Sequence, residues 1–212
     1  MNCIALKPDI HAIECEGGRG YRQFAYVLGM DGFSVLVDAT DPRDIPLIET
    51  FPAPRFLLLT HWHTRLGEAA YEERFGLKVY LHPADVAPPR EGPAAGTPAA
   101  SRYLDPREDE TLRGLGFRFV EVRGHTPGSL FIFWDRHGGV LFPGDSIVGA
   151  LAGEAQTLSF PPTPTCDDES LLRRSVRALP PPMVQNVLPL HGEPIVGAGT
   201  GEVARLWTHM LA

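Results

Sequence analysis

Lysine is scarce in this sequence, and its scarcity disfavours partners that carry many negative charges. The 212 residues include two lysines, Lys7 and Lys78, and no block of basic residues, and the formal net charge is −7. Proteins that bind nucleic acid need a clustered basic surface to neutralise the phosphates. We therefore expect no nucleic-acid partner.

Cysteines and long apolar runs are also few. The three cysteines, Cys3, Cys15 and Cys166, show no CxxC spacing, so the sequence predicts neither a disulfide framework nor a zinc knuckle. No apolar run reaches the roughly 18 residues of a membrane-spanning helix. The first ten residues lack the pattern of a secretory signal. We expect a cytoplasmic protein that makes no membrane contact.

The composition is that of an ordinary globular protein, with 43% hydrophobic and 21% charged residues. The length suits a single domain over residues 1–212. Apolar and β-branched runs, interrupted by turn signals such as Asp31-Gly32 and Gly138-Gly139, predict strands, and longer segments with capping residues predict helices. Strands are expected at 24–30, 33–37, 56–59, 79–81, 117–122, 130–134, 140–142 and 184–188, and helices at 45–50, 66–75, 167–179 and 199–211.

The order of these elements is strand-rich, helix, strand-rich, helix, with short connections. It suggests two mixed sheets packed face to face with helices outside, an αββα sandwich, although the order alone would also allow other α/β layers. Residues 86–100, rich in Pro, Ala and Gly, are expected to form a surface loop that overhangs the site and influences substrate choice.

Five polar residues share one context, because each lies just past the end of an expected strand. They are His61, His63, His125, Asp145 and His191. Loops that leave one edge of layered sheets converge, and functional sites are usually built there. The other histidines, His11, His82, His137 and His209, are interpreted as structural or surface residues.

The pair His61 and His63 predicts metal binding. Alternate residues of an extended chain share a face, so both imidazoles should point the same way, with Trp62 on the opposite face. A third imidazole, from His125, would complete a His₃ corner that leaves a position for water, which is a common catalytic zinc geometry. Asp145 could complete or bridge such a site, and Glu193 could hydrogen-bond His191.

Several segments together resemble the metallo-β-lactamase superfamily, with glyoxalase-II-like hydrolases the nearest branch in style. They are Val37-Asp38-Ala39-Thr40, Thr60-His61-Trp62-His63, Gly124-His125-Thr126-Pro127-Gly128-Ser129, Phe142-Pro143-Gly144-Asp145-Ser146 and Leu190-His191-Gly192. Their order and approximate spacing match the family over about residues 10 to 197. The resemblance implies an αββα fold and a hydrolytic site with one or two metal ions.

The sequence departs from the family at one motif. The family pattern His-x-His-x-Asp-His continues here with Arg65 and Leu66, and neither side chain offers a lone pair to a metal. In the family these two positions bind the second metal, so we expect at most one metal ion, held by His61, His63, His125 and Asp145. Zinc is the prediction, iron is the alternative, and a metal-free protein stays open.

Arg65 has two interpretations. It could lie where a second cation would be and replace part of that charge, pair with Asp145, or hold a substrate carboxylate or phosphate. Alternatively, it could turn outward to solvent.

Two functions follow from these residues. The first is a mononuclear metal-dependent hydrolase that acts on an ester, thioester, lactone or amide bond of a small molecule, with an anionic substrate as one option. Asp145 would serve as ligand or base, His191 would donate a hydrogen bond to the developing oxyanion, and Arg65 would orient the substrate. The second is a non-catalytic member of the family that binds a ligand or a protein.

Overall fold

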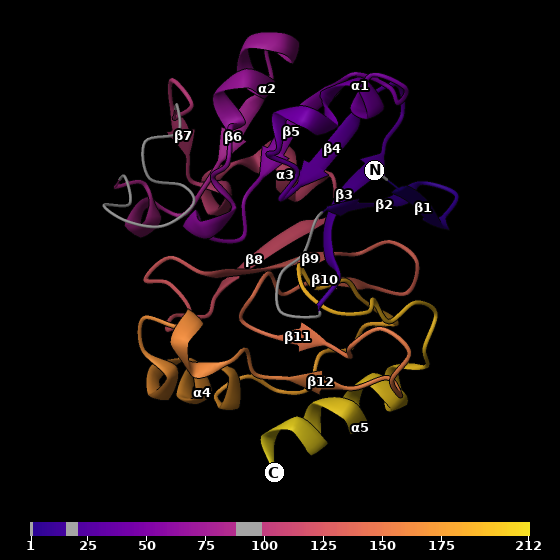
Figure 1. Ribbon diagram of the computed structural model, residues 1–212, viewed down its shortest axis with the longest axis vertical. Coiled ribbons are helices and arrows are strands. Elements are labelled where there is room, and N and C mark those ends of the chain that lie inside the picture. The colour runs from indigo at the N-terminus through magenta and orange to yellow at the C-terminus, as the bar shows by residue number, and fades with distance from the viewer. Residues whose placement is uncertain (1, 16–20, 88–98) are drawn as a thin grey trace. The chain divides into compact units, whose positions relative to one another are not determined.

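The computed structural model describes residues 2–15, 21–87 and 99–212. The chain divides into two compact units (Figure 1). The first comprises the described residues of Met1–Cys15 and Phe24–Pro106, and the second those of Glu16–Gln23 and Arg107–Ala212.

The first unit is built on a seven-stranded sheet in which the strands follow one another in chain order. β1 pairs antiparallel with β2, and β3 with β4, whereas β4, β5, β6 and β7 pair in parallel, so the sheet is mixed. The strands are β1 (Asn2–Lys7), β2 (Ile10–Cys15), β3 (Gln23–Gly29), β4 (Ser34–Val37), β5 (Pro54–Leu58), β6 (Lys78–Tyr80) and β7 (Tyr103–Leu104).

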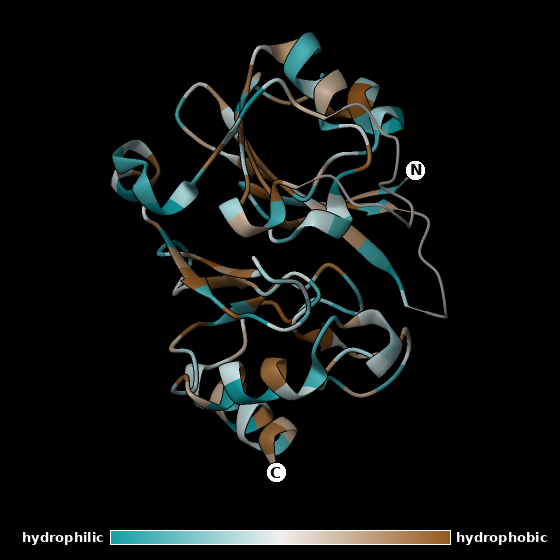
Figure 2. Cartoon of the chain, turned by 90° about the vertical axis from the view of Figure 1, so that its left-hand side faces the viewer, coloured by the Kyte–Doolittle hydropathy of each residue, from teal (hydrophilic) through white to brown (hydrophobic). Residues whose placement is uncertain are grey.

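Two helices cover one face of this sheet, α1 (Ile45–Ile48) and α2 (Glu68–Phe75). Ile48 and Tyr71 from these helices share a buried cluster with Leu36, Leu57 and Val79 from the middle of three neighbouring strands. All four residues of β4 are buried, including those that face away from this cluster. Burial on both faces explains why such strands read as continuous apolar runs, which Figure 2 shows as brown segments.

The second unit contains a four-stranded sheet of order β13-β10-β9-β8 and a small two-stranded sheet, β11-β12. β13 is parallel to β10, and the other pairs of the larger sheet are antiparallel. The strands are β8 (Phe117–Glu121), β9 (Leu130–Trp134), β10 (Val140–Phe142), β11 (Val148–Gly149), β12 (Leu158–Ser159) and β13 (Asn186–Val187), and the helices are α3 (Glu110–Gly114), α4 (Glu169–Arg177) and α5 (Thr200–Leu211).

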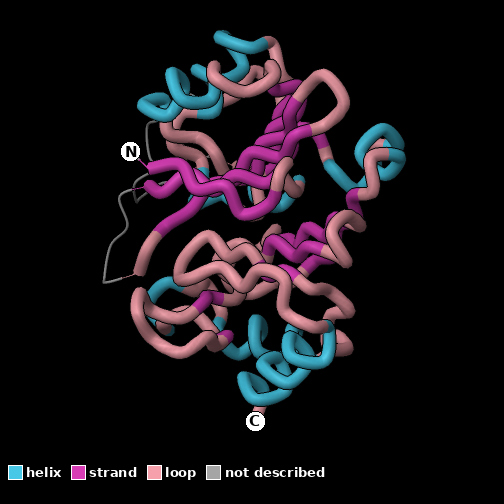
Figure 3. The backbone as a smooth tube through the Cα atoms, turned by 90° about the vertical axis from the view of Figure 1, so that its right-hand side faces the viewer, coloured by secondary structure: helices cyan, strands magenta, loops and turns pink. Residues whose placement is uncertain are grey.

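Helices α4 and α5 lie on the same side of the larger sheet of this unit (Figures 1 and 3). Leu172 of α4 and Trp207 of α5 pack in one buried cluster with Phe131 and Leu141 of the sheet. Asp168 caps α4 by accepting a hydrogen bond from Leu171 N at 2.8 Å, as expected for an acidic residue at a helix N-terminus.

The turn signals were correct where their chemistry is strong. Asp31-Gly32 joins β3 and β4 as a hairpin, with Gly32 at φ 78°. Gly76 ends α2 in the left-handed conformation, at φ 64°. The short strands β1, β2, β7, β11 and β12 and the helix α3 were not predicted, because elements of two to six residues with mixed polarity carry little periodic signal.

Most of the loop expected at 86–100 lies outside the described residues. Within the described part of the chain, no helix is both long and apolar enough to cross a membrane. The single domain over 1–212 and the cytoplasmic location stay predictions.

Gly124 and Gly76 provide a matched test of local packing. Both have positive φ, but a Cβ on Gly124 would lie 2.2 Å from Leu172 N, whereas one on Gly76 would meet nothing within 4 Å. We expect Gly76→Ala to cost about 1–2 kcal/mol of unfolding free energy and Gly124→Ala about 3 kcal/mol or more, because strain and overlap add. Urea denaturation measures both values, and equal costs would contradict the close approach of Gly124 to α4.

Candidate functional site

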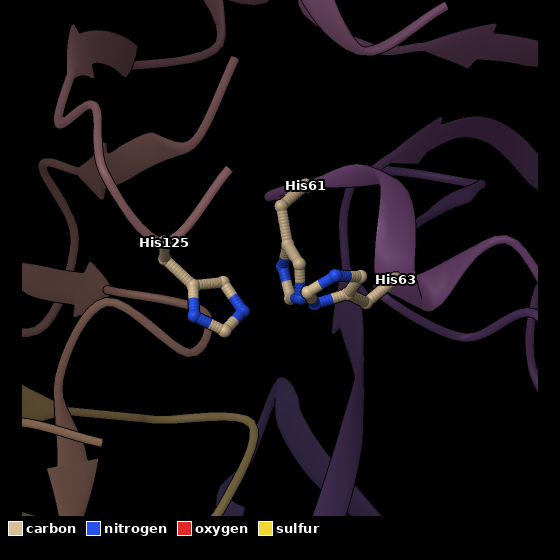
Figure 4. Close-up of side chains that lie close together, drawn as sticks. All are labelled: His61, His63 and His125. Atoms are coloured by element: carbon tan, nitrogen blue, oxygen red, sulfur yellow. The ribbon is translucent and has the colours of Figure 1, made fainter. Parts of the chain in front are cut away.

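The first unit carries His61 and His63 on a short turn after β5. His61 is extended, at φ −167° and ψ 172°, and Trp62–Thr64 forms one turn of 3-10 helix. The two imidazole rings lie 5.1 Å apart at 84° (Figure 4), and a ring nitrogen of one lies within 4.8 Å of a ring nitrogen of the other. The turn therefore brings the rings together. The expected alternation of an extended strand was wrong, and Trp62 contacts the His63 ring, with centroids 4.0 Å apart.

A chain of hydrogen bonds orients His61. Asp38, at the end of β4, accepts hydrogen bonds from the backbone N–H and the hydroxyl of Thr60, each at 2.8 Å. The same hydroxyl lies 2.9 Å from Nδ1 of His61. A hydroxyl has one proton, and Thr60 donates it in the hydrogen bond to Asp38. We therefore assign the proton between Thr60 and His61 to Nδ1 of His61, which donates to the hydroxyl oxygen. Nε2 of His61 then keeps its lone pair.

The backbone of the turn is fixed by buried side chains. Asp85 accepts a hydrogen bond from Trp62 N at 3.1 Å, and the Thr64 hydroxyl donates to the His61 carbonyl at 2.8 Å. The Thr40 hydroxyl donates to the Thr64 carbonyl. Nδ1 of His82 accepts from Ala84 N at 3.1 Å, which agrees with a structural role for that histidine.

Arg65 is buried, with 4% of its surface exposed. Its Nε donates to Glu68 at 3.1 Å, and its guanidinium donates to the Val86 carbonyl at 3.1 Å and lies 4.7 Å from the centre of the Tyr103 ring. The interpretation in which Arg65 turns outward to solvent was wrong, because a buried guanidinium needs a counter-charge and Glu68, itself fully buried, supplies it.

Tyr103 completes this buried group. Its hydroxyl donates to the Glu68 carboxylate. Burial, together with that hydrogen bond, raises the pKa of Tyr103 above its usual range, so the phenol stays protonated as a donor. Glu68 also accepts from Gly67 N at 3.3 Å.

In the second unit, His125 lies in a loop anchored to the start of α4. Its carbonyl accepts from Asp167 N at 3.1 Å, and the Gly124 carbonyl accepts from Asp168 N at 2.8 Å. The imidazole is 1% exposed, and its Nδ1 lies 3.8 Å from Sγ of Cys166. Burial raises the pKa of the Cys166 thiol, so the neutral thiol is the form beside the ring.

Asp145 lies between two histidines of the same unit. One carboxylate oxygen is 2.6 Å from Nδ1 of His191, and the other is 3.9 Å from Nε2 of His125. Glu193 forms an ion pair with Arg22, at 3.1 Å, so its carboxylate is engaged there. The suggestion that Glu193 hydrogen-bonds His191 finds no support in this contact.

A pocket of about 220 Å³ adjoins Asp145 and His191 within the second unit. Its other walls are mainly apolar, from Tyr21, Val148 and Pro161 among others. Sequence reasoning missed this pocket, because its walls come from distant short segments that carry no motif.

Solved structures of metallo-β-lactamases are similar to this chain in architecture. The metallo-β-lactamase DIM-1 aligns over 98% of this chain and 97% of its own, with a TM-score of 0.72 and 18% identity. The B3 metallo-β-lactamase BLEG-1 aligns over 96% of this chain and all of its own, with a TM-score of 0.68 and 23% identity. A metallo-β-lactamase from Pontibacter korlensis aligns over 99% of this chain and 96% of its own, with a TM-score of 0.69 and 18% identity.

The chain has the metallo-β-lactamase fold. The αββα fold class predicted from the sequence is thereby confirmed.

A curated relative points in the same direction. A hydroxyacylglutathione hydrolase of Anaeromyxobacter dehalogenans (strain 2CP-C) is 31% identical over 141 residues, which are 65% of this chain and 51% of that protein. The chain thus spans about half the length of this relative. No family model matches the sequence. The predicted resemblance to the metallo-β-lactamase superfamily, and to its glyoxalase-II-like branch, is confirmed.

On this metallo-β-lactamase fold, the predicted residues fall in two groups. His61, His63 and Arg65 lie in the first unit, and His125, Asp145 and His191 in the second. Their assignment as metal ligands and catalytic residues stays a prediction. The residues missed by sequence reasoning are the supports, Thr60, Glu68 and Tyr103 among them, although Glu68 stands three positions after Arg65 and could have been suspected as its partner.

The buried pair of Arg65 and Glu68 gives a stability prediction. Arg65→Met leaves the Glu68 carboxylate buried without its counter-charge, and we expect a loss of about 3–5 kcal/mol in urea denaturation. The double variant Arg65→Met with Glu68→Leu removes both charges and should be clearly more stable than Arg65→Met alone. Unchanged stability of the single variant would show that the ion pair is dispensable.

Proposed function

We propose that this chain is a metal-dependent hydrolase that holds one zinc ion through His61, His63 and His125, with Asp145 as a further ligand. Iron is the alternative metal. The main support for this function is the His61–His63 turn, which follows β5 and brings a ring nitrogen of each histidine within 4.8 Å of the other.

The donor set suits zinc. Zinc binds neutral imidazole nitrogens and carboxylate oxygens and prefers four ligands. The Asp38–Thr60 chain assigns the proton of His61 to Nδ1 and leaves Nε2 as the ligand atom. Nε2 of His125 is the nitrogen on the side of Asp145, at 3.9 Å.

The same residues support a single ion. Arg65 and Leu66 offer no lone pair where the family binds its second metal. The Arg65 guanidinium is held by Glu68 and the Val86 carbonyl. We therefore propose that Arg65 positions the turn after His63 through this buried pair, in preference to the substrate-orienting role first expected for it.

The reaction would be hydrolysis of an ester, thioester, lactone or amide bond in a small molecule. When bound, zinc would lower the pKa of water and polarise the scissile carbonyl. Asp145 holds the proton on Nδ1 of His191 in a short contact of 2.6 Å. With Nδ1 committed to Asp145, Nε2 of His191 is the nitrogen left to donate to a developing oxyanion when the ring is protonated, and the carboxylate stabilises that charged ring.

The non-catalytic alternative is less favoured. The curated relative is named a hydrolase, and the solved structures that align over nearly the whole chain are named metallo-β-lactamases. The hydrogen bonds that orient His61 and His191 are also those that a metal ligand and a catalytic donor require.

Metal content and activity test the function together. Protein purified without added metal should contain about one zinc or iron per chain and should hydrolyse at least one ester or thioester of a small-molecule panel. His63→Ala should lose both the metal and the activity. His209→Ala, which changes an exposed histidine on α5, should keep both. A chain that takes up no metal even after reconstitution would contradict the proposal.

Thr60 gives a sharper test of how His61 is held. Thr60→Val keeps the size of the side chain but removes the hydroxyl between Asp38 and His61, and we expect zinc affinity to fall about 10- to 100-fold. Thr60→Ser keeps the hydroxyl and should stay near the wild-type affinity. Competition with a chromogenic chelator measures the affinity, and equal values for Val and Ser would contradict the tautomer assignment.

A further inference from the structure

The pocket beside Asp145 and His191 has two kinds of wall. Asp145 and His191 form the polar wall. Tyr21, Val148, Pro161 and Pro162 form most of the remainder. These side chains present carbon surface, apart from the phenol of Tyr21, and no Lys or Arg is among the described lining residues.

Strand pairing and backbone contacts hold the apolar walls in place. Val148 lies in β11 and pairs with Ser159 of β12. The backbone of Glu193 approaches Gly149 so closely that a Cβ on Gly149 would lie 2.3 Å from the Glu193 carbonyl oxygen. Elsewhere in the lining, the hydroxyl and the N–H of Thr165 both donate to the Pro162 carbonyl, at 2.7 and 3.0 Å. The pocket is therefore formed before any ligand binds.

Charge and size limit what can fill this pocket. An anionic group seated against Val148, Pro161 and Pro162 would exchange its hydration shell for apolar walls, which is unfavourable. A neutral apolar group would lose only unfavourable contact with water. An apolar cavity of roughly 150 Å³ binds benzene, and the volume here is about 220 Å³.

We propose that the pocket binds a neutral apolar group of the substrate, an aryl or branched alkyl group of about six to nine carbon atoms, beside the bond that is cleaved. The inference rests on the proposed function in one respect, because it takes Asp145 and His191 as the catalytic end of the pocket. It adds a substrate class that the metal ligands do not specify.

Binding of two matched amides to the protein as purified tests the pocket. N-benzylacetamide is neutral and carries a phenyl ring, whereas N-acetylglycinamide is neutral and carries a polar carboxamide at the corresponding end. Protein-observed NMR at pH 7 should give a dissociation constant at least about tenfold lower for N-benzylacetamide. Equal affinities, or tighter binding of N-acetylglycinamide, would overturn the proposal.

Variants locate the binding. Val148→Phe fills the pocket and should weaken N-benzylacetamide binding by about tenfold or more, whereas Met183→Phe, at a side chain 76% exposed, should bind as the wild type does. If Val148→Phe does not fold, Tyr21→Ala removes one wall instead and should weaken binding about fivefold. Binding that survives in the folded pocket variant would place the ligand elsewhere and overturn the proposal.

Hydrolysis separates this inference from the proposed function. The wild type should prefer a phenylacetyl thioester over the succinyl thioester of the same thiol by about tenfold in kcat/KM. Amide binding at Val148 with no hydrolysis of any ester, thioester, lactone or amide would refute the hydrolase and uphold the pocket. Hydrolysis with a preference for the succinyl thioester would uphold the hydrolase and refute the pocket.

Discussion

The carboxylate of Asp38 ties the ends of two parallel strands together and sets the orientation of the first histidine. Asp38 N donates to Leu58 O at 3.0 Å, and its side chain receives both the N–H and the hydroxyl of Thr60. The residue adopts φ 54°, a conformation that aspartate tolerates better than most side chains. Because one hydroxyl links this carboxylate to His61, a backbone constraint at the strand end becomes a constraint on an imidazole tautomer.

A second constraint comes from the cation at Arg65. A buried guanidinium is costly unless its charge and its donors are matched, and here Glu68, a backbone carbonyl and the Tyr103 ring match them within the first unit. The network joins the turn after His63 to β7, which is distant in sequence. The positive charge of Arg65 is thus already neutralised by its own partners in the first unit.

The sequence predicted the strand ends well and their supports poorly. The sequence predicted β3, β4 and the His125 loop, because neighbouring residues largely determine their geometry. The local signals are continuous apolar runs, the Asp31-Gly32 turn and the Gly-His-Thr-Pro-Gly-Ser motif. The partners of Arg65 come partly from residues 20 to 40 positions away, and no local signal encodes such contacts. The His61–His63 pair was foreseen for the wrong reason, since a 3-10 turn and not an extended strand brings the rings together.

Asp145 shows how the polar and apolar parts of the second unit depend on each other. Its carboxylate contacts His191 and faces His125 while also forming one wall of a pocket whose other walls are carbon. Apolar walls exclude water, and hydrogen bonds of a charged group strengthen as the surroundings become less polar. The same walls that would select a neutral group therefore also strengthen the contact that holds His191. A change that makes this pocket polar should weaken both the selection and the histidine's orientation.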